Sequence, residues 1–223
     1  MRSNAPSCSS WRLYVILDRA AAGRADLVAL AEAAIRGGAD VIQLRDKHAA
    51  TRPLITEAQR LLRVTQAAGI PLLINDRADI ARHVAAAGVH LGQDDLPIAE
   101  ARAILGPQAI IGKSTHTLAQ ALAAEQEGAD YIGVGPIFAT PTKPAYAHVG
   151  TALIRQVAQQ VRLPMVCIGG IDQRTLPEVV QAGARCIAIV RAVCNASDPE
   201  AAAKKLRTLL LKSQTGTSSK EAF

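Results

Sequence analysis

Short apolar runs alternate along the chain with longer segments in which apolar residues recur at helical spacing. The short runs have the length and aliphatic content of buried β-strands, and the longer segments match amphipathic helices. We predict strands at residues 12–17, 40–47 with a polar end, 71–74, 89–91, 109–111, 131–134, 164–168 and 186–190. The predicted helices span residues 24–36, 52–67, 80–87, 97–105, 117–127, 151–161, 175–182 and 199–212. This alternation is typical of a parallel sheet covered by helices.

Helix ends and polar residues fall on opposite ends of these strands. Four similar joints lead from a helix into an apolar strand: Gly38-Ala39-Asp40, Ala87-Gly88-Val89, Gly128-Ala129-Asp130 and Gly183-Ala184-Arg185. We expect Gly88 to end the helix before it, as a C-terminal cap. Residues suited to chemistry follow the carboxyl ends of the strands, as in a (β/α)8 barrel. We therefore predict an α/β fold, a single-domain (β/α)8 TIM barrel over residues 11–212, with a flexible leader at 1–10 and a flexible tail at 213–223. A doubly wound sheet is the alternative.

The composition limits which residue types can fill the core and which kinds of ligand the protein can bind. The 223 residues are 49% hydrophobic but only 3% aromatic, which leaves Ala, Val, Ile and Leu to fill the core. The formal net charge of +6 suits either an anionic substrate or a nucleic acid. The four cysteines form no C-x-x-C pair, which favours buried thiols in a reducing compartment. No stretch matches a signal peptide or a membrane span, so we expect a cytoplasmic protein with no membrane partner.

The second strand ends in a cluster of polar and cationic side chains. Gln43, Arg45 and Lys47 alternate, so they project to one side of the strand. Arg offers a planar fork of donors and Lys a point charge, and together they are typical of an anion site. Either cation alone would fit a solvated loop, whereas three polar residues in register favour a binding site.

Two aspartates follow neighbouring predicted strands. Asp76 comes after the third strand and Asp95 after the fourth. Carboxylates at adjacent strand ends can share Mg²⁺, which takes one or two carboxylates together with substrate phosphate oxygens. The alternative is that each aspartate caps the following helix, which we prefer only for Asp94. A metal beside the cationic strand end indicates a pyrophosphate ligand.

Later loops offer two further candidates for phosphate binding. The long loop after the sixth strand carries Thr140, Thr142 and Lys143, and its length favours a lid over a plain surface loop. The loops after the seventh and eighth strands offer backbone N–H groups at Gly169-Gly170 and Val190-Arg191. In such barrels these two loops commonly form a phosphate site, although paired glycines also serve any tight turn.

Ser114 and His116 follow the predicted fifth strand, two residues apart. Since no acid partner is placed beside them, we do not interpret them as nucleophile and base. A Ser114 hydroxyl that donates to a phosphate is the simpler role. The remaining histidines lack metal-ligand spacing and are expected in the core or on the surface: His48, His83, His90 and His148.

Taken in order, these motifs resemble the thiamine-phosphate synthase family. The segments that carry the resemblance are Gln43-x-Arg45-x-Lys47, Asn75-Asp76, Gly92-Gln93-Asp94-Asp95, Ser114-Thr115-His116, Gly135-Pro136-Ile137-Phe138 with Thr140-x-Thr142-Lys143, and Gly169-Gly170-Ile171. Each is modest alone, but the ordered set spans most of the chain and is highly specific. It implies a Mg²⁺-dependent transferase that joins 4-amino-5-hydroxymethyl-2-methylpyrimidine diphosphate to a hydroxyethylthiazole phosphate, or its carboxy derivative. The products would be thiamine phosphate and pyrophosphate.

The resemblance also implies roles for individual residues. Five side chains would hold the pyrimidine diphosphate: Gln43, Arg45, Lys47, Asn75 and Lys143. Asp76 and Asp95 would hold Mg²⁺, and Ser114 would contact the pyrimidine. The thiazole phosphate would be received by Thr140, Thr142, Gly170 and the backbone around Val190 and Arg191, with Arg191 standing where the family often has a small hydroxyl residue. The expected catalytic residues are Arg45, Lys47, Lys143 and Ser114.

The expected reaction requires no nucleophile from the protein, because pyrophosphate leaves first and the thiazole nitrogen then attacks. A thiazole tautomerase-like barrel is one alternative, but it would need neither the cationic residues nor the aspartate pair. A nucleic-acid-binding module is the other, and it would want aromatic stacking, for which the chain has one Trp, three Tyr and two Phe. We therefore expect small-molecule substrates and no nucleic acid. The sequence leaves a homo-oligomer open.

Overall fold

The computed structural model describes residues 8–140 and 147–217, with side chains described as far as residue 213. Its eight strands are all parallel and pair in chain order, and β8 closes the ring against β1. They are β1 (Leu13–Asp18), β2 (Val41–Arg45), β3 (Leu72–Asn75), β4 (Gly88–Leu91), β5 (Ile110–Thr115), β6 (Tyr131–Val134), β7 (Met165–Ile168) and β8 (Cys186–Ile189). The predicted single-domain (β/α)8 barrel is confirmed, and the doubly wound sheet is excluded because these strands form a closed ring.

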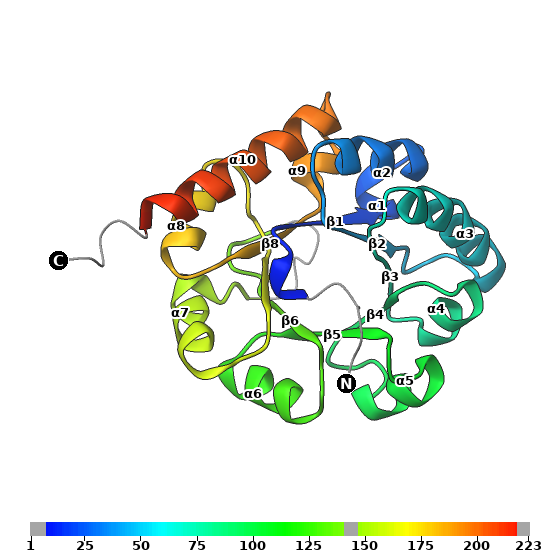
Figure 1. The fold of residues 1–223 in the computed structure, drawn as a ribbon, viewed down its shortest axis with the longest axis horizontal. Coiled ribbons are helices and arrows are strands. Elements are labelled where there is room, and N and C mark those ends of the chain that lie inside the picture. Colours follow the sequence, from blue (N-terminus) through cyan, green and yellow to red (C-terminus); the bar gives the residue numbers. More distant parts are fainter. Residues whose placement is uncertain (1–7, 141–146, 218–223) are drawn as a thin grey trace.

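Helices surround the ring of strands on its outside (Figure 1). The longer ones are α2 (Leu27–Arg36), α3 (Thr51–Ala67), α4 (Ala78–Val84), α5 (Ile98–Leu105), α6 (Leu118–Gln126), α7 (Gly150–Gln160), α8 (Leu176–Gln181) and α10 (Pro199–Thr217). The sequence did not predict two short helices, α1 (Arg19–Ala22) and α9 (Arg191–Cys194), which directly follow β1 and β8. Helix α10 also continues past its predicted end at residue 212. Within the described residues, none of these helices combines the length and apolar character needed to cross a membrane.

Alternation along the strands separates two apolar cores. Outward-pointing residues such as Val15 and Leu44 pack against the helices in a large aliphatic core. Inward-pointing residues such as Val41 and Val166 form a smaller cluster inside the barrel. The expected aliphatic core is therefore confirmed for the outer layer, whereas the inner cluster combines aliphatic residues with three aromatic rings.

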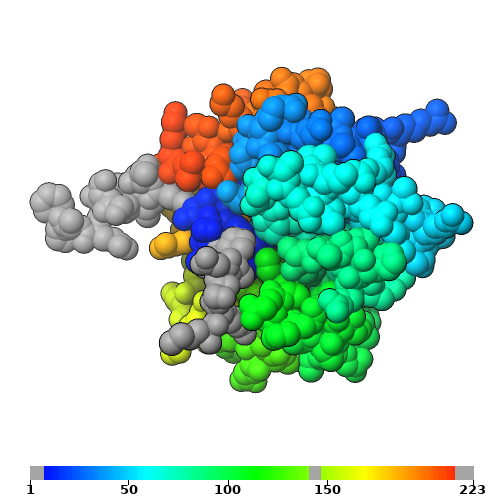
Figure 2. Space-filling model, turned by 45° about the vertical axis from the view of Figure 1, so that its right-hand side comes forward, coloured from blue at the N-terminus to red at the C-terminus, as the bar shows by residue number. Residues whose placement is uncertain are grey.

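Three aromatic side chains fill the amino-terminal part of the barrel. Trp11, Tyr14 and Tyr131 are each at most 2% exposed, and Trp11 meets Tyr131 edge to face at a centroid distance of 5.3 Å. Tyr131 has room because the neighbouring strand carries Gly112, where a Cβ would lie 2.1 Å from the tyrosine ring. The short 3-10 turn η1 (Cys8–Ser10) lies across this end of the barrel, in dark blue in Figures 1 and 2. The amino-terminal end of the barrel is thus closed.

Two element boundaries differ from the prediction in ways that matter for the site. β5 runs to Thr115, so Ser114 lies on the strand and not in the loop after it. The prediction that Gly88 caps a helix is wrong: α4 ends at Val84, its C-cap is Ala85 in the left-handed conformation with φ of 55°, and Gly88 begins β4. Glycine is needed at position 88 for a different reason, because a Cβ there would lie 1.8 Å from the carbonyl oxygen of Ile110.

Two of the repeated joints carry an aspartate that satisfies backbone donors at the amino-terminal face. Asp40 Oδ2 accepts hydrogen bonds from the N–H groups of Arg12 (2.8 Å) and Leu13 (2.9 Å). Asp130 Oδ2 accepts one from the N–H of Ile111 (2.9 Å). Because these N–H groups stand at the starts of β1 and β5, the aspartates serve the stability of the barrel.

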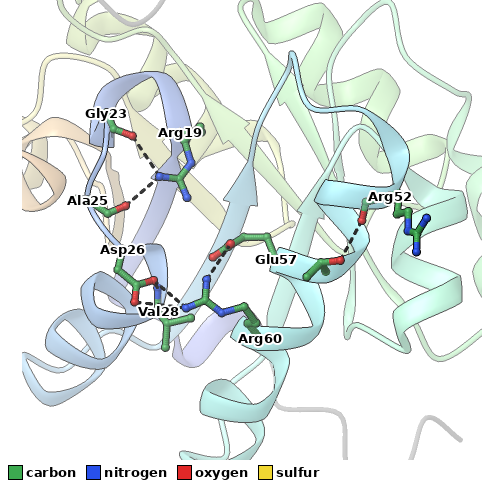
Figure 3. A network of polar contacts seen from close by, with 9 residues as sticks. Arg19, Gly23, Ala25, Asp26, Val28, Arg52, Glu57 and Arg60 are labelled. Carbon is green, nitrogen blue, oxygen red and sulfur yellow. Dashed lines mark hydrogen bonds and ion pairs between the residues drawn. The ribbon is translucent and has the colours of Figure 1, made fainter.

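A polar network joins the start of α2 to α3 on the surface (Figure 3). Asp26 caps α2 by accepting from the N–H of Val28 at 3.1 Å. Arg60 on α3 contacts Asp26 and Glu57, both at 3.2 Å. The Arg60 side chain is 41% exposed, so each pair is expected to contribute only about 0–1 kcal/mol. We assign this network to the packing of the two helices.

Candidate active site

A cavity of about 660 Å³ opens at the carboxyl ends of the strands, and all eight strands contribute residues to its walls. Every predicted site residue that the structure describes lines it: Gln43, Arg45, Lys47, Asn75, Asp76, Asp95, Ser114, Thr140, Gly170, Val190 and Arg191. Two further predicted residues, Thr142 and Lys143, lie outside the described residues. The carboxyl end of the barrel is also where enzymes of this fold carry their active sites.

The amide of Gln43 lies deep in one wall. This side chain is 1% exposed and donates from Nε2 to Asn75 Oδ1 at 3.1 Å. β2 and β3 are neighbours in the ring, and the register of their pairing brings the two amides together. The pair fixes the orientation of both side chains, and Asn75 keeps donor capacity for a ligand.

Arg45 pairs with a carboxylate that the sequence reading missed. Its guanidinium contacts Asp18, the last residue of β1, which lies opposite Arg45 in the β1–β2 register. Asp18 is 1% exposed and also caps α1 by accepting from the N–H of Ala21 at 2.9 Å. The signal in the sequence was an Asp at the end of the first strand, the same position that identified the other site residues. Asp18 therefore holds the arginine fork in place at the cavity wall.

Lys47, Asp76 and Asp95 form the second charged group of this wall. Lys47 Nζ lies 3.3 Å from Asp76 Oδ2. Asp76 has the left-handed conformation, with φ of 63°, and its N–H donates to the carbonyl of His90 at 2.9 Å. Asp95 Oδ2 accepts from the N–H of Gly92 at 2.5 Å. Local backbone geometry thus turns both carboxylates toward the same point, as predicted for neighbouring strand ends.

Burial and the neighbouring carboxylate disfavour the ionised form of Asp76. The pKa of Asp76 is raised to about 6, chiefly by burial and then by the adjacent Asp95 carboxylate, while Lys47 lowers it in part. No group of three or more His, Cys, Asp or Glu side chains suited to a metal occurs among the described residues. Two crowded carboxylates fit Mg²⁺, whose remaining positions are filled by water and substrate oxygens.

The alternative role of these aspartates as helix caps is not observed. Helix α4 begins after Arg77 and α5 after Pro97, and neither start has a side-chain capping bond. The preferred interpretation of Asp94 as a cap of α5 is therefore wrong, because the chain turns through Leu96 and Pro97 before the helix begins.

His90 is a site residue that sequence reasoning placed in the core or on the surface. Its Nε2 lies 2.9 Å from Ser114 Oγ, and its Nδ1 lies 2.8 Å from the Tyr131 hydroxyl. The ring of His116 instead contacts the carbonyl of Gly135, so Ser114 and His116 do not form a pair. A Cβ on Gly133 would lie 3.2 Å from the His90 ring, so the absence of a side chain at position 133 leaves room for the imidazole. A lone His within an apolar strand gave no signal of this role.

The opposite wall is formed by the glycines after β7. Gly169 and Gly170 have φ of 99° and 63°, a conformation that favours glycine. A Cβ on Gly170 would lie 2.7 Å from the Cβ of Phe138 in the loop after β6. That loop is tied to β7 by hydrogen bonds from Ile137 to Ile168 (2.8 Å) and from Phe138 to Gly169 (3.0 Å). At both glycines the cavity is therefore lined by the peptide backbone and not by a side chain.

Val190 and Arg191 stand beside these glycines, at the start of the short helix α9. Arg191 is exposed, as is Arg174 in the loop after β7, and both line the cavity. Arg174 also pairs with Asp172 at 3.3 Å. The cavity thus has a charged wall with paired acids and bases, and a second wall of backbone flanked by exposed arginines.

Comparison with known proteins agrees with this arrangement. A model of the thiamine monophosphate synthase family matches residues 13–193. A thiamine-phosphate synthase of Chloroflexus aurantiacus is 51% identical over 201 residues, which covers 90% of this chain and 93% of that protein. One of Shouchella clausii is 47% identical over 88% of this chain and 94% of its own length.

Solved structures lead to the same group. Thiamine phosphate pyrophosphorylase from Pyrococcus furiosus superposes with a TM-score of 0.84 at 36% identity, covering 92% of this chain and 98% of that one. A 3-hexulose-6-phosphate synthase shares the fold alone, with a TM-score of 0.63 at 22% identity. Since the match to the family covers almost the whole barrel, with high identity to its members, this chain belongs to the thiamine monophosphate synthase family.

Proposed function

We propose that this protein transfers the pyrimidinylmethyl group of 4-amino-5-hydroxymethyl-2-methylpyrimidine diphosphate to the nitrogen of a hydroxyethylthiazole phosphate. The bond from the methylene carbon to the diphosphate oxygen breaks, and a bond from that carbon to the thiazole nitrogen forms. The products are thiamine phosphate and pyrophosphate. Membership of the family supports the overall reaction, and the chemistry of the cavity supports the roles given to the residues.

The observation that carries the proposal is the charge on the wall formed by the ends of β1 to β4. Arg45 and Lys47 supply two formal positive charges, but Asp18, Asp76, Asp95 and the exposed Asp94 supply four negative ones when ionised. Alone, this wall would repel a diphosphate. A divalent cation at the aspartate pair would cancel this net negative charge and offer the diphosphate a positive centre beside Arg45 and Lys47.

We assign Mg²⁺ to Asp76 and Asp95, where it would neutralise the charge that develops on the departing pyrophosphate. Arg45, held by Asp18, is positioned to donate two parallel hydrogen bonds to phosphate oxygens. Lys47 is about half exposed and can turn from Asp76 toward the same group. The family resemblance adds Lys143, in the segment outside the described residues, to this set.

The pyrimidine ring would lie deeper in the cavity, against Ser114 and the Gln43–Asn75 amide pair. An electron-rich aminopyrimidine can stabilise positive charge on its methylene carbon once pyrophosphate departs. The protein then has to bind the leaving group, exclude water and hold the thiazole nitrogen close to that carbon. No side chain is needed as nucleophile.

The thiazole phosphate would lie against the opposite wall, near Thr140 and the glycines after β7. Gly170 and the backbone at Val190 and Arg191 present peptide groups without bulky side chains in the way. Backbone N–H groups in the last two loops of such barrels commonly bind phosphate. The exposed Arg191 adds positive charge at the rim of this pocket.

The direct test is to incubate the purified protein with both substrates and Mg²⁺ and to measure thiamine phosphate and pyrophosphate. The two products are expected in equal amounts, and none when either substrate is omitted or Mg²⁺ is chelated. Absence of thiamine phosphate under saturating conditions would reject the proposal and favour the tautomerase-like alternative. Thiamine phosphate made at full rate in excess chelator would keep the transferase and reject the metal.

A further inference from the structure

A chain of four hydrogen-bonding side chains runs along the inner lining of the cavity. The hydroxyls of Tyr14 and Tyr131 lie 3.0 Å apart. The Tyr131 hydroxyl lies 2.8 Å from His90 Nδ1, and His90 Nε2 lies 2.9 Å from Ser114 Oγ. These residues come from β1, β6, β4 and β5, so the closed barrel is what brings them together.

With a neutral imidazole, the protons in this chain can be ordered in only two ways. In the first, Tyr14 donates to Tyr131, Tyr131 donates to Nδ1 of His90, and the protonated Nε2 donates to Ser114. In the second, each donor and acceptor is exchanged: Ser114 donates to Nε2 of His90, the protonated Nδ1 donates to Tyr131, and Tyr131 donates to Tyr14. In the first order Ser114 can donate its proton to a ligand, whereas in the second its proton is already used and Ser114 can only accept.

The buried end of the chain, where Tyr14 follows Tyr131, decides between the two orders. The Tyr14 side chain is 2% exposed, and among the described residues Tyr131 is the hydrogen-bonding partner found for its hydroxyl. In the second order the Tyr14 proton would have no acceptor among the described side chains, and a buried donor left unpaired is costly. Burial also raises the pKa of both tyrosines well above the ordinary value, so neither phenol gives up its proton.

The same reasoning excludes a charged imidazole. A protonated His90 would donate from both ring nitrogens, and Tyr131 would have to turn its own proton toward Tyr14. The Tyr14 proton would again lack an acceptor. A single neutral tautomer of His90 satisfies every member of the chain.

We propose that His90 is a positioning residue which, by accepting from Tyr131 at Nδ1 and donating from Nε2, leaves the Ser114 proton free to donate into the cavity. The identity of the ligand rests on the proposed function. A donor at this position matches an unprotonated ring nitrogen of an aminopyrimidine and opposes the ring N–H of an oxopyrimidine. The two tyrosines would thus contribute to substrate selection through the proton order that they impose on His90 and Ser114.

The tautomer can be read directly by nitrogen NMR of the full-length protein labelled at histidine, without any substrate. Protonated and unprotonated ring nitrogens have well-separated chemical shifts, and His83→Asn and His90→Gln variants assign the signals. We expect the His90 proton on Nε2. A proton on Nδ1, or on both nitrogens at neutral pH, would overturn the proposal.

Two variants that each lose one buried hydroxyl form a matched pair. In Tyr14→Phe, Tyr131 still has only one acceptor for its proton, so His90 should keep the Nε2 tautomer. In Tyr131→Phe, Nδ1 loses its donor, and a second population protonated at Nδ1 should appear. Identical tautomer populations in the two variants would show that Tyr131 does not set the proton order.

A double-mutant cycle tests the consequence for the reaction. Tyr131→Phe should lower kcat/KM for the pyrimidine diphosphate about fivefold and Ser114→Ala about tenfold, while KM for the thiazole phosphate stays unchanged. The double variant should match Ser114→Ala alone, because Tyr131 acts through Ser114. Thr65→Val, which removes a buried hydroxyl bond in α3, controls for general destabilisation.

Additive losses in the cycle, or equal effects on both substrates, would reduce His90 and Tyr131 to structural roles and overturn the inference. Failure of the unaltered protein to form thiamine phosphate would instead refute the proposed function. The NMR result does not depend on turnover, so the two failures are distinguishable.

Discussion

Replacing Asp76 with Asn should stabilise the metal-free protein while removing most of its activity. Asn has nearly the shape of Asp and adopts the left-handed backbone of this position at least as readily. The substitution therefore removes one negative charge with little other change. Opposite effects on stability and activity are expected where a site holds charges that repel one another until its ligand binds.

The magnitude follows from the pKa of Asp76. That pKa rises from the ordinary 3.8 to about 6, about two pH units, which corresponds to at most about 3 kcal/mol. The Asp76 side chain is 23% exposed, so we expect about 1–2 kcal/mol after solvent screening.

The pH dependence has a definite sign. Because the folded protein holds the Asp76 proton more tightly than the unfolded chain does, ionisation of Asp76 costs folding free energy. The cost is absent below about pH 4, grows up to about pH 6 and is constant above it. Since Asn does not ionise, the stability advantage of Asp76→Asn should follow this curve.

The assay is urea unfolding between pH 4 and pH 8, with and without Mg²⁺, beside steady-state kinetics. Mg²⁺ at about a hundred times its Kd should stabilise the unaltered protein by about 2.7 kcal/mol and the variant far less. Turnover of the variant should fall on the order of 10²- to 10³-fold. The control is Asp79→Asn, the same change at an exposed residue of α4 that pairs with Arg77, and it should keep full activity. Equal stability of Asp76→Asn and the unaltered protein at pH 8 without Mg²⁺ would refute the cost assigned to ionising Asp76, and undiminished turnover would refute the metal role.

Three further expectations concern the two walls and the chemistry between them. Lys47→Ala should raise KM for the pyrimidine diphosphate on the order of tenfold, because one charge-assisted contact is lost. The control, Lys204→Ala on the exposed face of α10, should leave this KM unchanged. Equal effects of the two changes would mean that Lys47 does not belong to the site. Gly170→Val should mainly raise KM for the thiazole phosphate, since its Cβ would lie 2.7 Å from Phe138 at a φ of 63°; an equal rise for both substrates would mean that the walls are wrongly divided. An electron-withdrawing group on the pyrimidine should slow single-turnover chemistry severely and change affinity little; a rate indifferent to the substituent would favour direct displacement by the thiazole.

The barrel could be predicted from sequence because its signals are local and repeated. Alternating apolar runs and amphipathic helices fix the class of fold, and polar residues after the strands indicate the functional end. The candidate site residues at or directly after strand ends, such as Arg45 and Asp76, needed no further information. Strand and helix boundaries were harder, because the close approach of β4 to Ile110 explains Gly88 and lies outside any local window.

The inward-facing residues could not be predicted, because the sequence shows which residues share a face but not what faces them. His90 and Tyr131 looked like ordinary core residues, and their contact with Ser114 depends on the register of three strands. Asp18 was overlooked although it follows a strand, because its partner Arg45 was read as a ligand for phosphate alone. The glycines at 112 and 133 were the available signal, since small residues inside a barrel make room for large ones.

The aromatic side chains of Trp11, Tyr14 and Tyr131 separate the active-site cavity from the amino-terminal end of the barrel. The cavity at the carboxyl end and a smaller one of about 260 Å³ beneath η1 share no lining residue, because these rings stand between them. On the proposed assignment, both substrates would enter and both products leave through the carboxyl-terminal opening. The pyrimidine diphosphate, which reaches as deep as Ser114, would then bind before the thiazole phosphate, and thiamine phosphate would leave after pyrophosphate.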